Sequence, residues 1–143
     1  MANAIDVAKY LLSLVDTDAD EGMSNMKLQK LLYYCQGFHL AMTGKRLFSE
    51  DIYAWLHGPV VPEVWHEYNQ YGANVIPYPQ GVDFSKIDAK EKSIIDDVYS
   101  LYGQYSAWGL RNMTHDESPW KETPRDCPID DRKMVAFFKT QLD

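Results

Sequence analysis

Residues 26–42 read MKLQKLLYYCQGFHLAM and carry the strongest periodicity of the chain. Side chains that share one face of an α-helix recur there at positions Leu28, Leu31, Leu32, Cys35, His39 and Met42. Ser24 or Asn25 can cap the start of this helix, and Gly44 can supply the left-handed residue that commonly ends one. We therefore predict a long helix over about residues 25–43 that forms part of the core.

Five further helices are expected from capping residues and apolar spacing on either side of this one. Their starts are marked by Asn3, Pro62, the pair Asp88 and Glu91, Ser106, and the pair Asp130 and Asp131. The first is broken over residues 16–22, and the last spans about residues 129–142. Residues 114–128 hold three prolines and are predicted to form a structured loop.

Two short strands are predicted between these helices. Residues 52–56 are β-branched and aromatic and precede Gly58 and Pro59, and Val75 and Ile76 are the second candidate. The predicted fold class is mainly α, a compact bundle of about six helices with a minor two-strand β element. We expect residues 1–143 to form a single domain, with helices 25–43 and 88–102 at its core and the turn at residues 55–62 packed over them.

Composition narrows the classes of partner. The chain has 143 residues, a formal net charge of -7 and a pI near 5.0, which argues against nucleic acid, because that binding requires Lys and Arg at phosphates. A basic protein partner suits this charge better. Cys35 and Cys127 form no metal-binding or disulfide pattern. No export signal or membrane-length apolar run is evident, so we expect a cytoplasmic protein and no membrane partner.

Motifs for catalysis are missing. The chain has no HExxH, P-loop, GxSxG or GxGxxG sequence. His115-Asp116-Glu117 is similar to the HxE of zinc deaminases, but the required PCxxC is absent and Cys127 stands alone. We expect no cofactor, no metal and no catalytic residue. The open alternative is a metal-dependent hydrolase that uses His57, His66 or His115 with a carboxylate such as Glu63 or Glu117.

Lysines and tyrosines alternate along the predicted helix 25–43. Lys27 and Lys30 with Tyr33 and Tyr34 could serve nucleic acid, since bases stack on aromatic rings beside cations. With only two lysines on an acidic chain, we favour a solvated helix face with stacking tyrosines.

A rigid turn follows the first predicted strand. Residues 55–62 read WLHGPVVP, and two prolines and a glycine fix how the next helix begins. This rigidity is compatible with a purely structural role. It could equally present Trp55, His57 or Trp65 to a partner, because preorganised aromatic side chains bind at low entropic cost.

Five blocks of the sequence, in order, resemble the Panacea domain, also described as SocA-like or phage-associated. They are Met26–Tyr34, Gly44–Phe48, Ala54–Val64, the group Tyr102-Gly103, Ser106-Ala107 and Leu110, and the segment from Thr114-His115 through Pro119-Trp120. Together they extend the resemblance from about Ile5 to Trp120, which is far more specific than one short motif.

The resemblance implies an antitoxin that neutralises a cognate protein toxin by direct binding. Some members of the family instead deliver a toxin to a cytosolic protease, and this adaptor role stays the alternative. The family implies no catalytic role. The residues that we predict to bind the partner are Trp55, His57, Pro59, Trp65, His115 and Trp120. In the contrary interpretation, Trp55, Trp108 and Trp120 are simply core residues.

Overall fold

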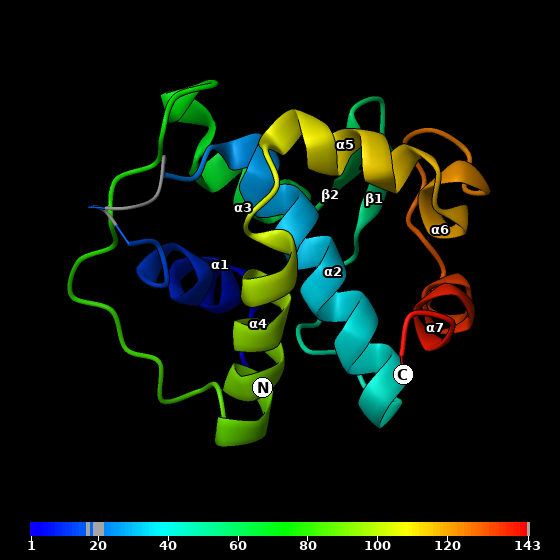
Figure 1. Cartoon of the computed structure of the whole chain (residues 1–143), viewed down its shortest axis with the longest axis horizontal. Coiled ribbons are helices and arrows are strands. Elements are labelled where there is room, and N and C mark those ends of the chain that lie inside the picture. The colour runs from blue at the N-terminus through cyan, green and yellow to red at the C-terminus, as the bar shows by residue number, and fades with distance from the viewer. Residues whose placement is uncertain (17, 19–21, 143) are drawn as a thin grey trace.

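Helix α2, Asn25–Thr43, runs through the middle of the computed structural model, and the other elements pack around it (Figure 1). The structure describes residues 1–16, 18 and 22–142. Within these ranges the other elements are α1 (Ala4–Ser13), β1 (Tyr53–Trp55), β2 (Gly58–Val60), α3 (Pro62–Glu67), the 3-10 helix η1 (Asn69–Tyr71), α4 (Ala89–Tyr102), α5 (Ala107–His115), α6 (Ser118–Lys121) and α7 (Asp131–Lys139). The mainly α prediction is confirmed. The predicted break at 16–22 lies mostly outside the described residues.

Capping residues at the helix starts were predicted correctly. The side chains of Asn3 and Asp88 each accept a hydrogen bond from the amide three residues on, and in both cases the acidic side chain there completes a capping box. The side chains of Ser24 and Ser106 also accept a hydrogen bond from the amide three residues on, at the starts of α2 and α5, but without a capping box. Gly44 ends α2 with φ 75°, the left-handed conformation expected of it.

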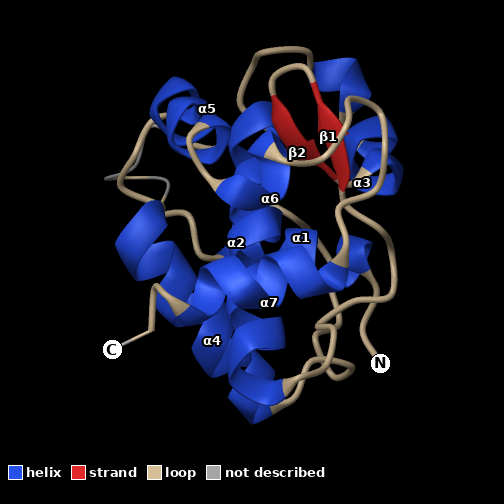
Figure 2. Cartoon of the chain, turned by 90° about the vertical axis from the view of Figure 1, so that its right-hand side faces the viewer, coloured by secondary structure: helices blue, strands red, loops and turns tan. Residues whose placement is uncertain are grey.

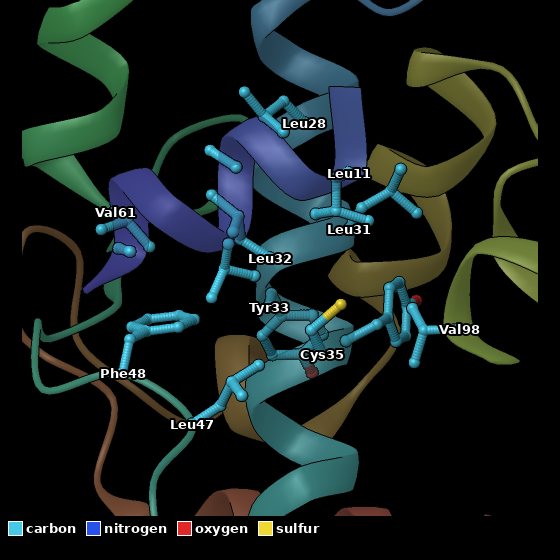
Figure 3. Packing of buried hydrophobic residues seen from close by; sticks show 14 of the residues in the cluster. Leu11, Leu28, Leu31, Leu32, Tyr33, Cys35, Leu47, Phe48, Val61 and Val98 are labelled. Carbon is cyan, nitrogen blue, oxygen red and sulfur yellow. The ribbon is translucent and has the colours of Figure 1, made fainter. Parts of the chain in front are cut away.

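Helix α2 is buried on all sides over residues 28–40, and it reaches solvent only towards its ends. The predicted apolar stripe is buried except for Met42, which is 51% exposed, so its assignment to the stripe is wrong. The side chains of Lys30, Tyr33 and Tyr34 are also at most 1% exposed. The prediction that these three lie on a solvated face is therefore wrong. They are enclosed because α4, α5, α7 and β2 all pack against α2. Figure 3 shows Tyr33 among the apolar side chains of the core.

A single antiparallel hairpin makes up the sheet. Strands β1 and β2 pair Tyr53 with Val60 and Trp55 with Gly58 (Figure 2). The two-strand element is confirmed, but its second strand is not at residues 75–76, as predicted. Val75 forms only an isolated bridge with Ser24. The short turn after Trp55 lets the chain pair back on itself at once, which satisfies the backbone locally.

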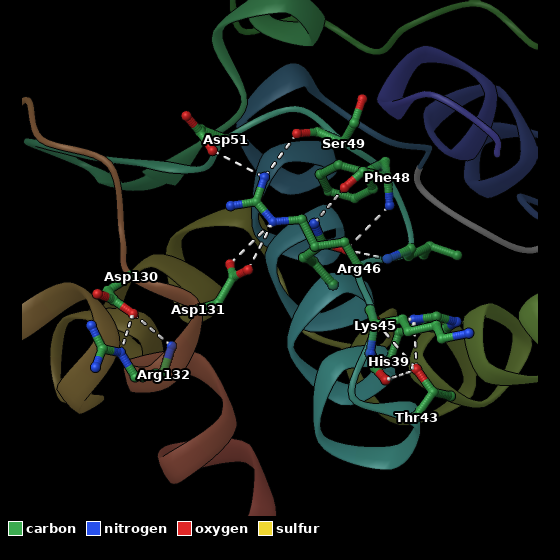
Figure 4. A network of polar contacts seen from close by, with 12 residues as sticks. His39, Thr43, Lys45, Arg46, Phe48, Ser49, Asp51, Asp130, Asp131 and Arg132 are labelled. Carbon is green, nitrogen blue, oxygen red and sulfur yellow. Dashed lines mark hydrogen bonds and ion pairs between the residues drawn. The ribbon is translucent and has the colours of Figure 1, made fainter.

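Helix α7 packs against α2 and completes the core. Its Phe138 is fully buried and packs its ring against Tyr33 and Phe38, with centroids 5.3 Å and 5.0 Å apart. Arg46 fixes the start of α7, because its Nε donates to both carboxylate oxygens of Asp131 at 3.2 Å and 3.0 Å (Figure 4). The predicted terminal helix is thus confirmed, with bounds slightly inside those expected.

The segment predicted to be a loop at residues 114–128 contains regular structure. Its first two residues end α5, and α6 occupies Ser118–Lys121. Pro119 is tolerated in α6 because it lies in the first turn, where its missing N–H has no partner to lose.

Candidate functional site

The hairpin and helices α5 and α6 bring most of the predicted partner-binding residues into one region. Trp120 Nε1 donates a hydrogen bond to the carbonyl oxygen of Trp55 at 2.7 Å. The ring of His115 stacks on Trp120 with centroids 3.8 Å apart and planes 8° apart. Trp65 meets Trp55 edge to face at 6.2 Å. An aromatic chain thus connects α3, the hairpin, α6 and the end of α5.

Exposure differs among these six residues. His57 is exposed at the hairpin turn, whereas Trp55, Trp65, His115 and Trp120 are half-buried. Pro59 is buried, and its carbonyl oxygen accepts a hydrogen bond from Lys30 Nζ at 3.2 Å. Only part of the predicted set therefore presents a side chain to solvent.

Two exposed residues and one half-buried residue that the sequence did not single out for binding lie beside His57. Leu56 is 69% and Trp108 56% exposed, so Trp108 is not a core residue. The guanidinium of Arg111 lies 4.4 Å from the centroid of the Trp108 ring, and its Nε donates to His57 Nδ1 at 3.2 Å. We call Leu56, His57, Trp108 and Arg111 the Trp108 patch. The signal was helical spacing, since positions 108, 111 and 115 lie opposite the buried positions 110 and 114 of α5.

A buried polar cluster lies beneath this surface. The hydroxyl groups of Tyr33 and Tyr34 donate to the two carboxylate oxygens of Glu117 at 2.9 Å and 2.8 Å. Burial raises the pKa of Glu117 to about 7, although the two tyrosine hydrogen bonds oppose this rise. Burial also lowers the pKa of Lys30 to about 7, and the positive charge of Arg111 adds to this effect. Burial therefore moves the pKa of both groups towards neutrality, upwards for the carboxyl group and downwards for the amino group.

Gly58 makes room for the buried lysine. Its φ is 114°, which L side chains rarely adopt, and a Cβ there would lie 2.6 Å from Lys30 Cε. The hairpin can therefore close over the lysine only with glycine at this position. Because Lys30 is enclosed by the fold, its ammonium supports the hairpin and does not face solvent.

His115 is surrounded by positive charge. Burial lowers its pKa, and Arg111, Lys30, Arg125 and His57 lower it further. Its Nε2 is buried and has no hydrogen-bond partner among the described residues. The ring is therefore neutral at pH 7 and packs flat on Trp120, with the guanidinium of Arg125 3.6 Å from the Trp120 centroid.

The three histidines of the hydrolase alternative do not build a metal site. Within residues 1–16, 18 and 22–142, no group of three or more His, Cys, Asp or Glu side chains is placed to hold a metal ion. His57 contacts Arg111 and His115 stacks on Trp120. His66 is exposed on α3 and takes part in neither contact. The contacts of this region are aromatic and cationic.

Comparison with family models identifies the family of this chain. The family model described as "Antitoxin SocA-like, Panacea domain" matches residues 28–121, about two thirds of the chain. The chain belongs to this family. No curated protein and no solved structure gives a match. The matched part of this Panacea domain runs from the first turns of α2 to the end of α6 and includes the whole Trp108 patch, whereas α1 and α7 lie outside it.

The polar cluster of this Panacea domain predicts how its stability depends on pH. Glu117 has a folded pKa of about 7 against 4.5 in a free chain, so the folded state binds more protons between these values. Its contribution to stability is therefore lost as pH rises from 4.5 to 7. Lys30 has a folded pKa of about 7 against 10.5. The unfolded state binds more protons there, so stability rises from pH 7 towards 10.5.

Two variants separate these contributions. In the wild type, the free energy of unfolding should fall by about 1–3 kcal/mol between pH 4.5 and 7 because of Glu117. In Glu117→Gln this fall should be absent. Lys30→Met should remove a rise of about the same size, roughly 1–3 kcal/mol, between pH 7 and 9.5. Urea unfolding at a series of pH values measures both. Parallel curves for the wild type and either variant would contradict the assignment of that group.

Proposed function

We propose that this chain is an antitoxin that neutralises a cognate protein toxin by forming a complex with it, without a cofactor and without catalysis. The match to the antitoxin family over residues 28–121 carries the proposal. The surface supports it, because an exposed Trp and an Arg in contact are the side chains that most often dominate the energy of protein interfaces. The proposal includes no nucleic acid and no membrane as a partner and does not specify an oligomeric state.

Charge favours a basic toxin as the overall partner. The net charge of -7 would attract a basic protein at long range and raise the association rate. We further propose that the protein acts in the cytoplasm and that residues 1–143, α7 included, fold as one domain. Cys35 and Cys127 are free, as a reducing compartment allows. None of the helices in the described ranges has the length and apolar character that crossing a bilayer requires.

Co-expression tests the proposal. The product of the neighbouring gene, induced alone, should stop growth, and induction of this chain beside it should restore growth. A neighbouring product that is harmless alone, or that stays toxic beside this chain, would refute the antitoxin function. Immunoblots of the toxin separate two mechanisms: a constant toxin level indicates neutralisation by binding, whereas a level that falls and recovers on deletion of a cytosolic protease indicates an adaptor.

A further inference from the structure

Positive charge without carboxylate partners gathers around the Trp108 patch. The salt bridges of the described residues involve Arg46 and Arg132, and none involves Arg111 or Arg125. The neighbouring carboxylate of Glu117 accepts hydrogen bonds from the hydroxyl groups of Tyr33 and Tyr34. Arg111 and Arg125 therefore bring positive charge that is unpaired among the described residues to the region of the patch, on a chain of net charge -7.

The guanidinium of Arg111 is fixed in position at this patch by its contacts with neighbouring side chains. Its Nε donates to His57 Nδ1 at 3.2 Å and its Nη1 to Asn112 Oδ1 at 3.1 Å, while the guanidinium lies over Trp108. Its Nη2 has no hydrogen-bond partner in the described part of the chain, so it keeps donors free. A guanidinium fixed in this way loses little entropy when it pairs with a carboxylate.

Apolar surface adjoins the free donors. Leu56 projects from the hairpin turn and Trp108 from α5, and both are more than half exposed. Burial of their apolar area would add to the energy of an ion pair and would also exclude water from it. The groove between α2, α4 and residues 141–142 is a weaker candidate, because the only charged residue along its lining is Asp97 and it offers no cation.

We propose that the Trp108 patch binds an acidic segment of the protein toxin, with a toxin carboxylate on Arg111 and an apolar toxin side chain against Trp108 and Leu56. This inference rests on the proposed antitoxin function. The overall negative charge would steer a basic toxin towards the molecule, and the cationic patch would select the one segment of the toxin that fits. Opposite charges at close range fix the register of a complex in this way.

Binding measurements with the purified product of the neighbouring gene test the patch. Trp108→Ala and Arg111→Glu should each raise the Kd at least about 30-fold, the effect of losing a central interface residue. Leu101→Ala and Arg132→Glu are the matched controls, because Leu101 is 60% exposed in the competing groove and the side chain of Arg132 is 93% exposed. Both controls should bind as the wild type does, and urea unfolding should show that all four variants are folded under the conditions of the binding measurement.

A chemical test identifies the group opposite Arg111. Arg111→Lys keeps the positive charge and supplies a primary amine, so a carbodiimide should join it by an amide bond, with loss of water, to an Asp or Glu of the toxin. Mass spectrometry should locate that bond at position 111. A complex that forms without any cross-link at this position would overturn the proposed ion pair.

Other outcomes refute the inference separately from the antitoxin function. If the wild type binds the toxin and the two patch variants bind equally well, only the inference fails. The same holds if Trp108→Ala abolishes a dimer of this chain in sedimentation, or binding of a DNA oligonucleotide, and leaves toxin binding unchanged. If the wild type does not bind the toxin at all, the inference and the proposed function fail together.

Discussion

Phe138→Ala should lower the free energy of unfolding by about 3–5 kcal/mol, the cost of a large cavity in a packed core. Phe138 lies on α7, outside the segment that the family model matches, yet it is fully buried against α2. Its ring meets those of Tyr33, Tyr34 and Phe38 within 6 Å. Urea unfolding should show one transition at lower urea. A variant as stable as the wild type would show that α7 is not part of the core.

Gly37 makes this prediction more specific. A Cβ at Gly37 would overlap the Phe138 ring, so Gly37→Ala alone should cost about 1–3 kcal/mol through overpacking. In Phe138→Ala the added methyl group would instead enter the vacated space. The double variant should therefore be more stable than the sum of the single changes by at least about 1 kcal/mol.

A helical glycine elsewhere provides the control for this cycle. Gly109 lies in α5, and the nearest atoms to an added Cβ are Ser106 Oγ at 3.1 Å and Tyr105 Cβ at 3.9 Å. Gly109→Ala should change stability by no more than about 1 kcal/mol, because the gain in helix propensity is opposed by the close contact with Ser106 Oγ. Additive effects of Gly37→Ala and Phe138→Ala would show that α7 does not pack on α2 as described.

Gln36→Leu should cost about 3–4 kcal/mol, because it leaves several buried polar groups without partners. Gln36 Oε1 accepts from the amides of Leu47 and Phe48 at 2.7 Å and 3.3 Å, and Nε2 donates to the Phe48 carbonyl at 2.8 Å. These bonds hold the loop after α2 against the core. The exposed Gln70 is the control, and Gln70→Leu should change stability by less than about 0.5 kcal/mol.

Hydrogen exchange gives this prediction a local readout. The amides of Leu47 and Phe48 should exchange faster in Gln36→Leu, while amides in the middle of α4 should change only as much as global stability does. Unchanged protection at residues 47 and 48 would mean that another group holds the loop.

Local chemistry explains what could be predicted from the sequence. Helix starts at Asn3, Ser24, Asp88 and Ser106 depend on a side chain and an amide two or three residues apart, so the pattern is legible in the chain itself. The end of α2 at Gly44 could be predicted for the same reason, because it depends on the conformation of a single glycine. The family blocks, likewise, follow the order of the sequence and identified the family correctly.

Tertiary contacts explain what could not be predicted. Lys30, Tyr33 and Tyr34 are polar or amphipathic residues beside an apolar stripe, and only the packing of α5, α7 and β2 around α2 buries them. The second strand was placed at residues 75–76 because the true partner of β1, Gly58–Val60, contains a glycine and a proline and was interpreted as part of a turn. Trp108 could have been assigned to the surface from its position opposite Leu110, but the placement of His57 beside Arg111 depends on how the hairpin folds against α5.

Neutralisation by direct binding is tested most directly with two purified proteins and no protease. The activity of the toxin, measured against increasing amounts of this chain, should fall in proportion and reach zero at a fixed stoichiometric ratio, with the toxin intact on a gel. A toxin that keeps its full activity in a large excess of this chain would contradict neutralisation by complex formation.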